Sequence, residues 1–140
     1  MLARRLFLGG LGAMCLFAAG HFAGFLQAAR AARKDPNMAD LTRAMREHTT
    51  TLLGFRPSIL DFREYFSLNF SILLVLAAAL GFVAVSNPSL QQPATLRQLS
   101  VVYAVALLVL LGSSVYFSVV QGIIGCLAIA VLFLLAAWLA

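Results

Sequence analysis

Three long stretches of the chain carry no charged side chain, and this feature limits the possible folds more than any other. The stretches are Phe66–Val85, Leu99–Val120 and Ile123–Ala140. From Phe66 to the last residue, the only charged side chain belongs to Arg97. An α-helix needs about 20 apolar residues to cross the hydrocarbon core of a bilayer, and each stretch comes close to that length. The sequence therefore predicts a chain that resides in a membrane.

The overall composition agrees with a lipid environment. The chain has 140 residues, of which 62% are hydrophobic and 11% are charged, and its mean hydropathy is +0.96. Soluble domains are about 25% charged. A short chain this apolar lacks the polar groups to cover its own surface in water. We expect a single membrane domain that covers residues 1–140, with the lipid bilayer as its immediate partner.

Basic side chains outnumber acidic ones, and the formal net charge is +5. They do not form the dense block that nucleic-acid binding requires, so we expect no nucleic-acid partner. Arg4 and Arg5 precede the first apolar run, and the basic residues between the first and second runs are interleaved with all five acids. Basic residues that flank membrane spans report on topology and contact lipid phosphates. With four spans, the positive-inside rule favours a cytoplasmic location for the long first loop, whereas the dibasic start of the first span favours the opposite orientation.

The first apolar run, Leu6–Ala29, has two interpretations. An arginine pair before it and small residues after it are also found in cleavable export signals. The run is longer than the 7–15 apolar residues of a typical signal core. Its glycines Gly12, Gly20 and Gly24 are spaced in multiples of four, and small residues on one stripe let membrane helices approach closely. We therefore expect a retained span at 6–29 with these glycines in helix packing.

Asp35-Pro36 indicates the start of a second helix, because aspartate is a good N-cap and proline suits the first helical position. Apolar residues at helical spacing then alternate with charged ones, and Arg43 and Glu47 form an expected i,i+4 pair. Gly54 is the expected stop. The pattern predicts an amphipathic helix at 36–53 that is too polar to span and lies along the membrane surface.

The remaining spans follow from caps and turns. Ser58 and Asp61 form a predicted capping box at the head of the second span. Thr95 is the expected cap of the third span, and a tight turn after it makes the third and fourth helices antiparallel neighbours. The predicted spans are 6–29, 58–85, 96–117 and 120–139. The fold class is therefore all-α, a four-helix transmembrane bundle with an amphipathic interfacial helix between spans one and two.

His21 is the one side chain in the first span that is suited to acid–base or ligand chemistry. An ionisable group at membrane depth is costly, so it is a functional candidate by default. One interpretation is a histidine that carries protons or faces a haem or quinone. The other is a neutral imidazole that is hydrogen-bonded across the bundle, for instance to Tyr103, Tyr116 or Gln121.

A second group of polar residues stands at the head of the second span: Asp61, Glu64, Tyr65 and Asn69. Asp61 and Glu64 are three residues apart, so they share a helix face and are able to hold a cation or share a proton. The structural alternative is that Asp61 caps the helix, Glu64 pairs with an arginine and Tyr65 anchors at the interface. These residues and His21 are the ligand-binding candidates. We find no complete catalytic set, no metal-site spacing and no cofactor motif.

Short motifs spread over the chain stand in a recognisable spacing: Gly20-His21-Phe22, Asp61-Phe62, Phe66-Ser67-Leu68, Arg97 and Tyr116-Phe117. In this spacing the chain resembles, over most of residues 20–140, a family of small four-helix bacterial membrane proteins of uncharacterised function. It departs from the family pattern at Tyr65, where the family usually has glycine, and at Val119, where a proline usually follows. The resemblance implies the four-helix architecture and brings no activity. We expect a multi-pass protein of the cell inner membrane.

Arg63-Glu64-Tyr65-Phe66 at the head of a span is also similar to a motif of the four-helix membrane enzymes that metabolise glutathione and eicosanoids. Those enzymes need arginine, asparagine and glutamate at fixed spacing, followed by a proline in the span. Here Asn69 follows Glu64 instead of preceding it, and the span has no proline.

Two hypotheses for the function follow. The first is a non-enzymatic membrane subunit that forms a homo-oligomer or joins a larger membrane complex, with Gly12, Gly20 and Gly24 at the contact and residues 35–65 as a docking surface. The alternative is a small-molecule or lipid binder, transporter or enzyme, with a pocket near His21 and Asp61–Asn69.

Overall fold

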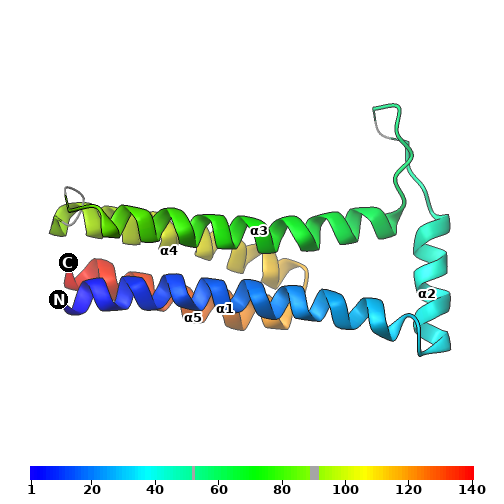
Figure 1. Cartoon of the computed structure of the whole chain (residues 1–140), viewed down its shortest axis with the longest axis horizontal. Helices are drawn as coiled ribbons and strands as arrows, with labels where there is room; N and C mark the ends of the chain where they lie inside the picture. Colours follow the sequence, from blue (N-terminus) through cyan, green and yellow to red (C-terminus); the bar gives the residue numbers. More distant parts are fainter. Residues whose placement is uncertain (52, 89–91) are drawn as a thin grey trace. The chain divides into compact units, whose positions relative to one another are not determined.

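The computed structural model describes residues 1–51, 53–88 and 92–140. All regular elements in this part of the chain are helices, in the order α1 (Leu2–Ala31), α2 (Pro36–Glu47), α3 (Ile59–Ser86), α4 (Pro93–Tyr116) and α5 (Val120–Leu139) (Figure 1). The helices α1, α3, α4 and α5 are long and apolar enough to cross a membrane. The predicted all-α fold with four membrane-crossing helices and a short helix after the first is confirmed.

The chain divides into two compact units. Unit 1 consists of Met1–Phe17 and Val75–Ala140, and unit 2 consists of Ala18–Leu74. The long helices α1 and α3 contribute to both units, whereas α4 and α5 belong to unit 1 and α2 belongs to unit 2. Unit 1 therefore contains segments of all four membrane-crossing helices, and unit 2 contains the polar segment between two of them.

Three aromatic rings form the centre of unit 1. Phe7 of α1 and Phe133 of α5 are fully buried, and their rings meet edge to face with centroids 5.2 Å apart. The Tyr103 ring of α4 lies 5.6 Å from Phe7 and 5.0 Å from Phe133. The Tyr103 hydroxyl donates a hydrogen bond of 2.5 Å to the carbonyl oxygen of Ala77 on α3. This aromatic cluster thus connects all four helices of unit 1.

Two glycines let the helices of unit 1 approach this cluster. A Cβ atom at Gly10 would lie 2.8 Å from the nearest ring atom of Phe133. A Cβ atom at Gly81 would lie 2.7 Å from Leu11 Cδ2 and 2.7 Å from the Tyr103 hydroxyl oxygen. Real Cβ atoms do not come this close, so this packing requires glycine, which has no Cβ atom, at both positions. Close approach through small residues is the usual way in which membrane helices associate.

A short turn joins α4 to α5. In this turn Ser118 has a positive φ of 56°, and the backbone N–H of Val119 donates to the Ser114 carbonyl oxygen at 2.8 Å. The two helices then pack along each other as antiparallel neighbours, which confirms the prediction (Figure 1).

The start of α4 differs from the prediction. The helix begins at Pro93 with Gln92 as N-cap, so Thr95 lies inside the first turn and the predicted Thr95 cap is wrong. Proline at the first helical position has a suitable φ and lacks only an N–H group that would be unpaired there. Two parts of predicted elements, Leu52 in the amphipathic helix and 89–91 in the loop before α4, lie outside the described residues.

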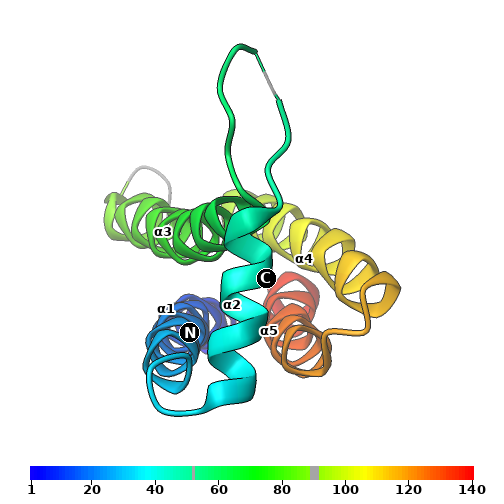
Figure 2. The same ribbon diagram turned by 90° about the vertical axis from the view of Figure 1, so that its right-hand side faces the viewer.

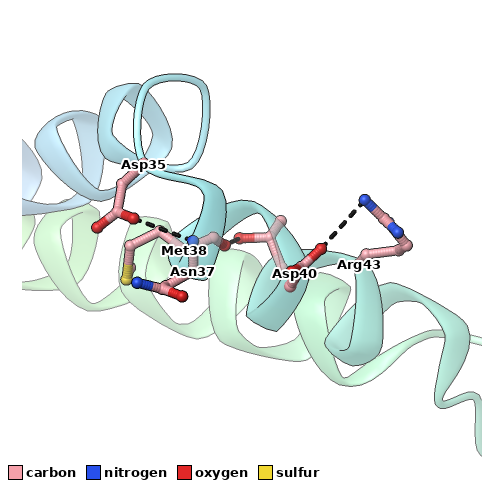
Figure 3. A network of polar contacts seen from close by, with 6 residues as sticks. Asp35, Asn37, Met38, Asp40 and Arg43 are labelled. Atoms are coloured by element: carbon pink, nitrogen blue, oxygen red, sulfur yellow. Dashed lines mark hydrogen bonds and ion pairs between the residues drawn. The ribbon is translucent and has the colours of Figure 1, made fainter.

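The helix α2 begins as predicted. The Asp35 carboxylate accepts a hydrogen bond of 3.0 Å from the backbone N–H of Asn37, and Pro36 stands in the first turn (Figure 3). None of the α2 residues is buried. Among the described residues, its one ion pair joins Arg43 to Asp40 at 3.2 Å, so the predicted pairing of Arg43 with Glu47 is wrong. Both side chains are about 70% exposed, and exposed pairs of this kind contribute little to stability.

The end of α2 comes earlier than predicted, at Glu47. After it, Thr49 forms an isolated antiparallel bridge with Ser58, and the described residues on either side of 52 belong to the loop between α2 and α3 (Figure 2). Thr49–Thr51 is a run of β-branched residues, which favour extended backbone over helix. Gly54, the expected helix stop, instead has φ +85° in the turn of this loop.

Apolar side chains cover the outer surface of unit 1. On α4, Val102 and Val109 are 64% and 70% exposed, and on α5 Ile124 is 64% exposed. Soluble monomers rarely expose continuous apolar surface of this kind. Lipid tails accept such side chains at no cost, so this surface is typical of helices that cross a bilayer.

Candidate functional site

The capping box at the head of α3 accounts for Asp61. The Asp61 carboxylate accepts hydrogen bonds of 2.8 Å from the backbone N–H and from the hydroxyl of Ser58. In return, the Ser58 hydroxyl oxygen accepts a bond of 3.1 Å from the Asp61 backbone N–H. The predicted capping box is confirmed. The carboxylate and the backbone N–H of Asp61 are therefore both hydrogen-bonded to Ser58 at the start of α3.

Tyr65 and Asn69 lie on the same helix, one turn apart. The Asn69 side-chain amide donates a hydrogen bond of 2.8 Å to the Tyr65 carbonyl oxygen. The Tyr65 ring is 61% exposed and packs edge to face on Phe66, with centroids 5.6 Å apart. The Asn69 amide thus bonds to its own helix, and the Tyr65 ring faces outward.

Glu64 is the member of the predicted group that lies in a groove. In unit 2 the end of α1, one side of α2 and the first turns of α3 enclose a groove of about 530 Å³. This volume falls within the roughly 300–1,000 Å³ of typical small-ligand sites. The charged side chains that line it are Arg33, Arg43, Arg46, Glu47, Arg63 and Glu64.

The arginines of this groove, which we call the basic groove, have few partners. Arg43 contacts Asp40 outside the groove lining. Within the described residues, Arg33, Arg46 and Arg63 form no ion pair with any acid at 4 Å or less. Each guanidinium carries five N–H donors in a planar arrangement that matches carboxylate and phosphate oxygens. The groove therefore offers unused donors to an anion.

His21 lies in unit 2 away from the basic groove lining. Its ring packs edge to face on Phe70 of α3, with centroids 5.0 Å apart. Nε2 is buried and has no hydrogen-bond partner among the described residues. Tyr103, one of the partners proposed for it, donates its hydroxyl hydrogen to Ala77 instead. The expected hydrogen bond from this nitrogen across the bundle is therefore not found.

The predicted packing glycines Gly12, Gly20 and Gly24 are all exposed. A Cβ atom at any of the three would have no other atom within 4 Å, apart from its own local backbone. They take no part in packing within the described chain. The glycines with that role are others, Gly10 and Gly81 among them.

A second, smaller cavity of about 240 Å³ lies at the end of unit 1 where the chain begins and ends. Met1 and Ala140 both line it, together with Val85 of α3 and Leu96 of α4. Both termini therefore lie at the same end of unit 1, as expected for an even number of membrane crossings (Figure 1). Among the described residues that line it, Arg4 is the one with a charged side chain.

The sequence predicts only one side of the basic groove. Glu64 is one of the ligand-binding candidates predicted from the sequence, whereas Arg33 and Arg46 count there only as basic residues that flank the spans. Arg33 follows α1, Arg46 lies in α2 and Arg63 lies in α3, and only the fold brings them to one groove. The available signal is the excess of seven basic over five acidic residues between the first two apolar runs.

Comparisons of the chain with models of known protein families, with curated proteins and with solved structures found no match. The class of the protein therefore follows from its own helices. It is a small all-α chain with four helices that suit membrane crossing, the pattern of a multi-pass membrane protein.

Proposed function

We propose that the chain is a non-enzymatic component of the bacterial inner membrane that associates with other membrane helices, first of all with a second copy of itself. The single observation that carries this proposal is the unoccupied glycine face of α1. Gly12, Gly20 and Gly24 have no packing partner within the described chain. In a bilayer, helices associate mainly where small residues let their backbones approach.

The rest of α1 supports this role. Leu16 stands between Gly12 and Gly20 at helical spacing and is 76% exposed. A large side chain flanked by glycines on one stripe is the pattern of a ridge and a groove that fit a second, identical helix. The resemblance to small four-helix bacterial membrane proteins supports the inner-membrane location. The basic residues between the first two spans favour a cytoplasmic position for that segment.

Disulfide crosslinking in membranes tests this association. In a variant with Cys15→Ala and Cys126→Ala, a new cysteine at Leu16 should form a disulfide-linked dimer on oxidation. A matched cysteine at Val109, which is 70% exposed on α4, should not. Adding Gly20→Leu to the Leu16→Cys variant should reduce the dimer about tenfold, because a bulky side chain keeps the helices apart.

Gly112→Leu is the control for that last step. Gly112 is exposed on α4 and, like Gly20, has nothing within 4 Å of a Cβ position. This change should leave the crosslink unchanged. Equal crosslinking at Leu16→Cys and Val109→Cys would contradict the proposal, and so would a Leu16→Cys dimer that survives Gly20→Leu.

A further inference from the structure

We propose that the basic groove of unit 2 binds the phosphate group of an anionic phospholipid. This role is independent of helix association through the glycine face of α1. The observation behind it is a set of arginines that converge on one groove from the end of α1, from α2 and from α3, of which only Arg43 forms an ion pair within the described residues.

The charge of the groove favours an anion. Arg33, Arg43, Arg46 and Arg63 line it together with Glu47 and Glu64, so basic side chains exceed acidic ones by two. Asp61 lies two residues before Arg63, and its carboxylate is hydrogen-bonded to Ser58. Arg33, Arg46 and Arg63 form no ion pair among the described residues, so their donors are left for a ligand. Arginine binds phosphate through two parallel charge-assisted hydrogen bonds, which are stronger than neutral ones.

The position of the groove favours a lipid as the source of that phosphate. Arg33 follows the last turn of α1, and Arg63 lies in the second turn of α3, so the groove stands where two membrane-crossing helices end. Lipid headgroups lie at this level of a bilayer, and basic pockets there bind anionic headgroups.

The uncharged lining of the groove suits the same ligand. Ala29 and Ala32 of the α1 end and Ala39 of α2 line it beside the arginines. These small side chains leave room and present apolar surface to the glycerol and upper acyl part of a lipid. A free inorganic phosphate has no apolar part that could contact this surface.

Native mass spectrometry of the full chain in detergent provides the test. The protein is titrated with phosphatidylglycerol, and with phosphatidylcholine as the lipid without net charge. The double variant Arg46→Gln/Arg63→Gln should weaken phosphatidylglycerol binding by about tenfold or more, because each lost arginine removes charged hydrogen bonds. The variant Arg5→Gln/Arg97→Gln loses the same charge outside the groove and should bind as the unmodified chain does.

A second variant covers the case in which the arginine changes disturb folding. Glu64→Gln removes a negative charge from the groove lining and should tighten phosphatidylglycerol binding severalfold. A folding defect does not produce a gain in affinity. The direction of this change therefore separates a binding site from a merely structural arginine cluster.

Three results would overturn the proposal. An equal loss in both double variants would show that net charge alone attracts the lipid. Equal binding of phosphatidylglycerol and phosphatidylcholine would show that the anionic headgroup is not recognised. Displacement of the lipid by millimolar inorganic phosphate, with the same dependence on Arg46 and Arg63, would assign the groove to the free ion instead.

Discussion

The two units use the same long helices in opposite ways. In unit 1, α1 and α3 meet α4 and α5 through glycines and buried aromatic rings, with Phe7 and Phe133 fully buried. In unit 2, the continuations of α1 and α3 enclose arginines and glutamates together with α2. The largest buried side chains of the described residues all belong to unit 1.

This difference shows how one pair of helices serves two environments. Unit 1 satisfies its few polar groups internally, as the Tyr103 bond to Ala77 illustrates, and exposes apolar side chains that suit lipid tails. Unit 2 leaves donors unpaired, which is tolerable only where water or headgroups reach them. Stability is therefore expected to depend on unit 1 and ligand recognition on unit 2.

The largest effect is expected from Gly10→Val in unit 1. Its new side chain would overlap the buried Phe133 ring, and overpacking of this kind typically costs about 1–3 kcal/mol. The adjacent change Gly9→Val is the matched control, because nothing lies within 4 Å of a Cβ atom there. Thermal unfolding in detergent, followed by circular dichroism, should show a lower midpoint for Gly10→Val alone. Equal midpoints would show that the close approach is not needed.

A medium effect is expected from Tyr103→Phe. This change keeps the ring in its aromatic contacts and removes the hydrogen bond to the Ala77 carbonyl oxygen. The free energy of unfolding should fall by about 0.6–1.5 kcal/mol, the range for single hydrogen bonds in membrane and soluble proteins. The same unfolding measurement detects this as a lower midpoint. Tyr116→Phe, at a ring that is 82% exposed, should change nothing. An unchanged unfolding midpoint for Tyr103→Phe would show that this hydrogen bond does not stabilise unit 1.

Ser58→Ala in unit 2 should have a local effect. Ser58 is buried and caps α3. Loss of such a cap lowers the free energy of unfolding by about 1 kcal/mol where the first turn of the helix unfolds together with the rest of the protein. Because unit 2 has little buried core, we expect faster hydrogen exchange at 59–62 and almost no change in the global unfolding midpoint. A global shift as large as that of Gly10→Val would contradict the division of roles between the units.

The smallest effect is expected from Asp40→Ala on α2. Its ion pair with Arg43 is exposed to solvent on both sides. Exposed pairs of this kind are screened by water and salt and contribute little. The unfolding midpoint should not move at either low or high salt. A clear salt-dependent shift would mean that α2 is held more firmly than its exposure indicates.

Local signals predicted the structure well. The membrane-crossing helices follow from uncharged length, and the caps at Asp35 and Ser58 follow from residues at most three positions apart. The predicted Thr95 cap was wrong because Pro93 already begins the helix two residues earlier. The overlong α2 was wrong because the threonine run after Glu47 prefers extended backbone.

Contacts between residues that are far apart in the chain could not be predicted from the sequence. Spacing alone does not distinguish glycines that pack inside the chain, such as Gly10, from those that face outward, such as Gly12. The two lie two residues apart on one helix, and they differ in whether another helix packs against them. The basic groove has the same cause, because Arg33 and Arg63 stand far apart in sequence and meet only in the folded unit.

Cysteine accessibility in membrane vesicles tests most directly whether the long helices cross a bilayer. In a variant with Cys15→Ala and Cys126→Ala, single cysteines are placed at Leu108 in α4 and at Thr50 in the exposed loop of unit 2. With both vesicle faces open to a water-soluble maleimide, Thr50→Cys should react fully, and Leu108→Cys should react only after detergent is added. Rapid labelling of Leu108→Cys in the intact bilayer would contradict the account.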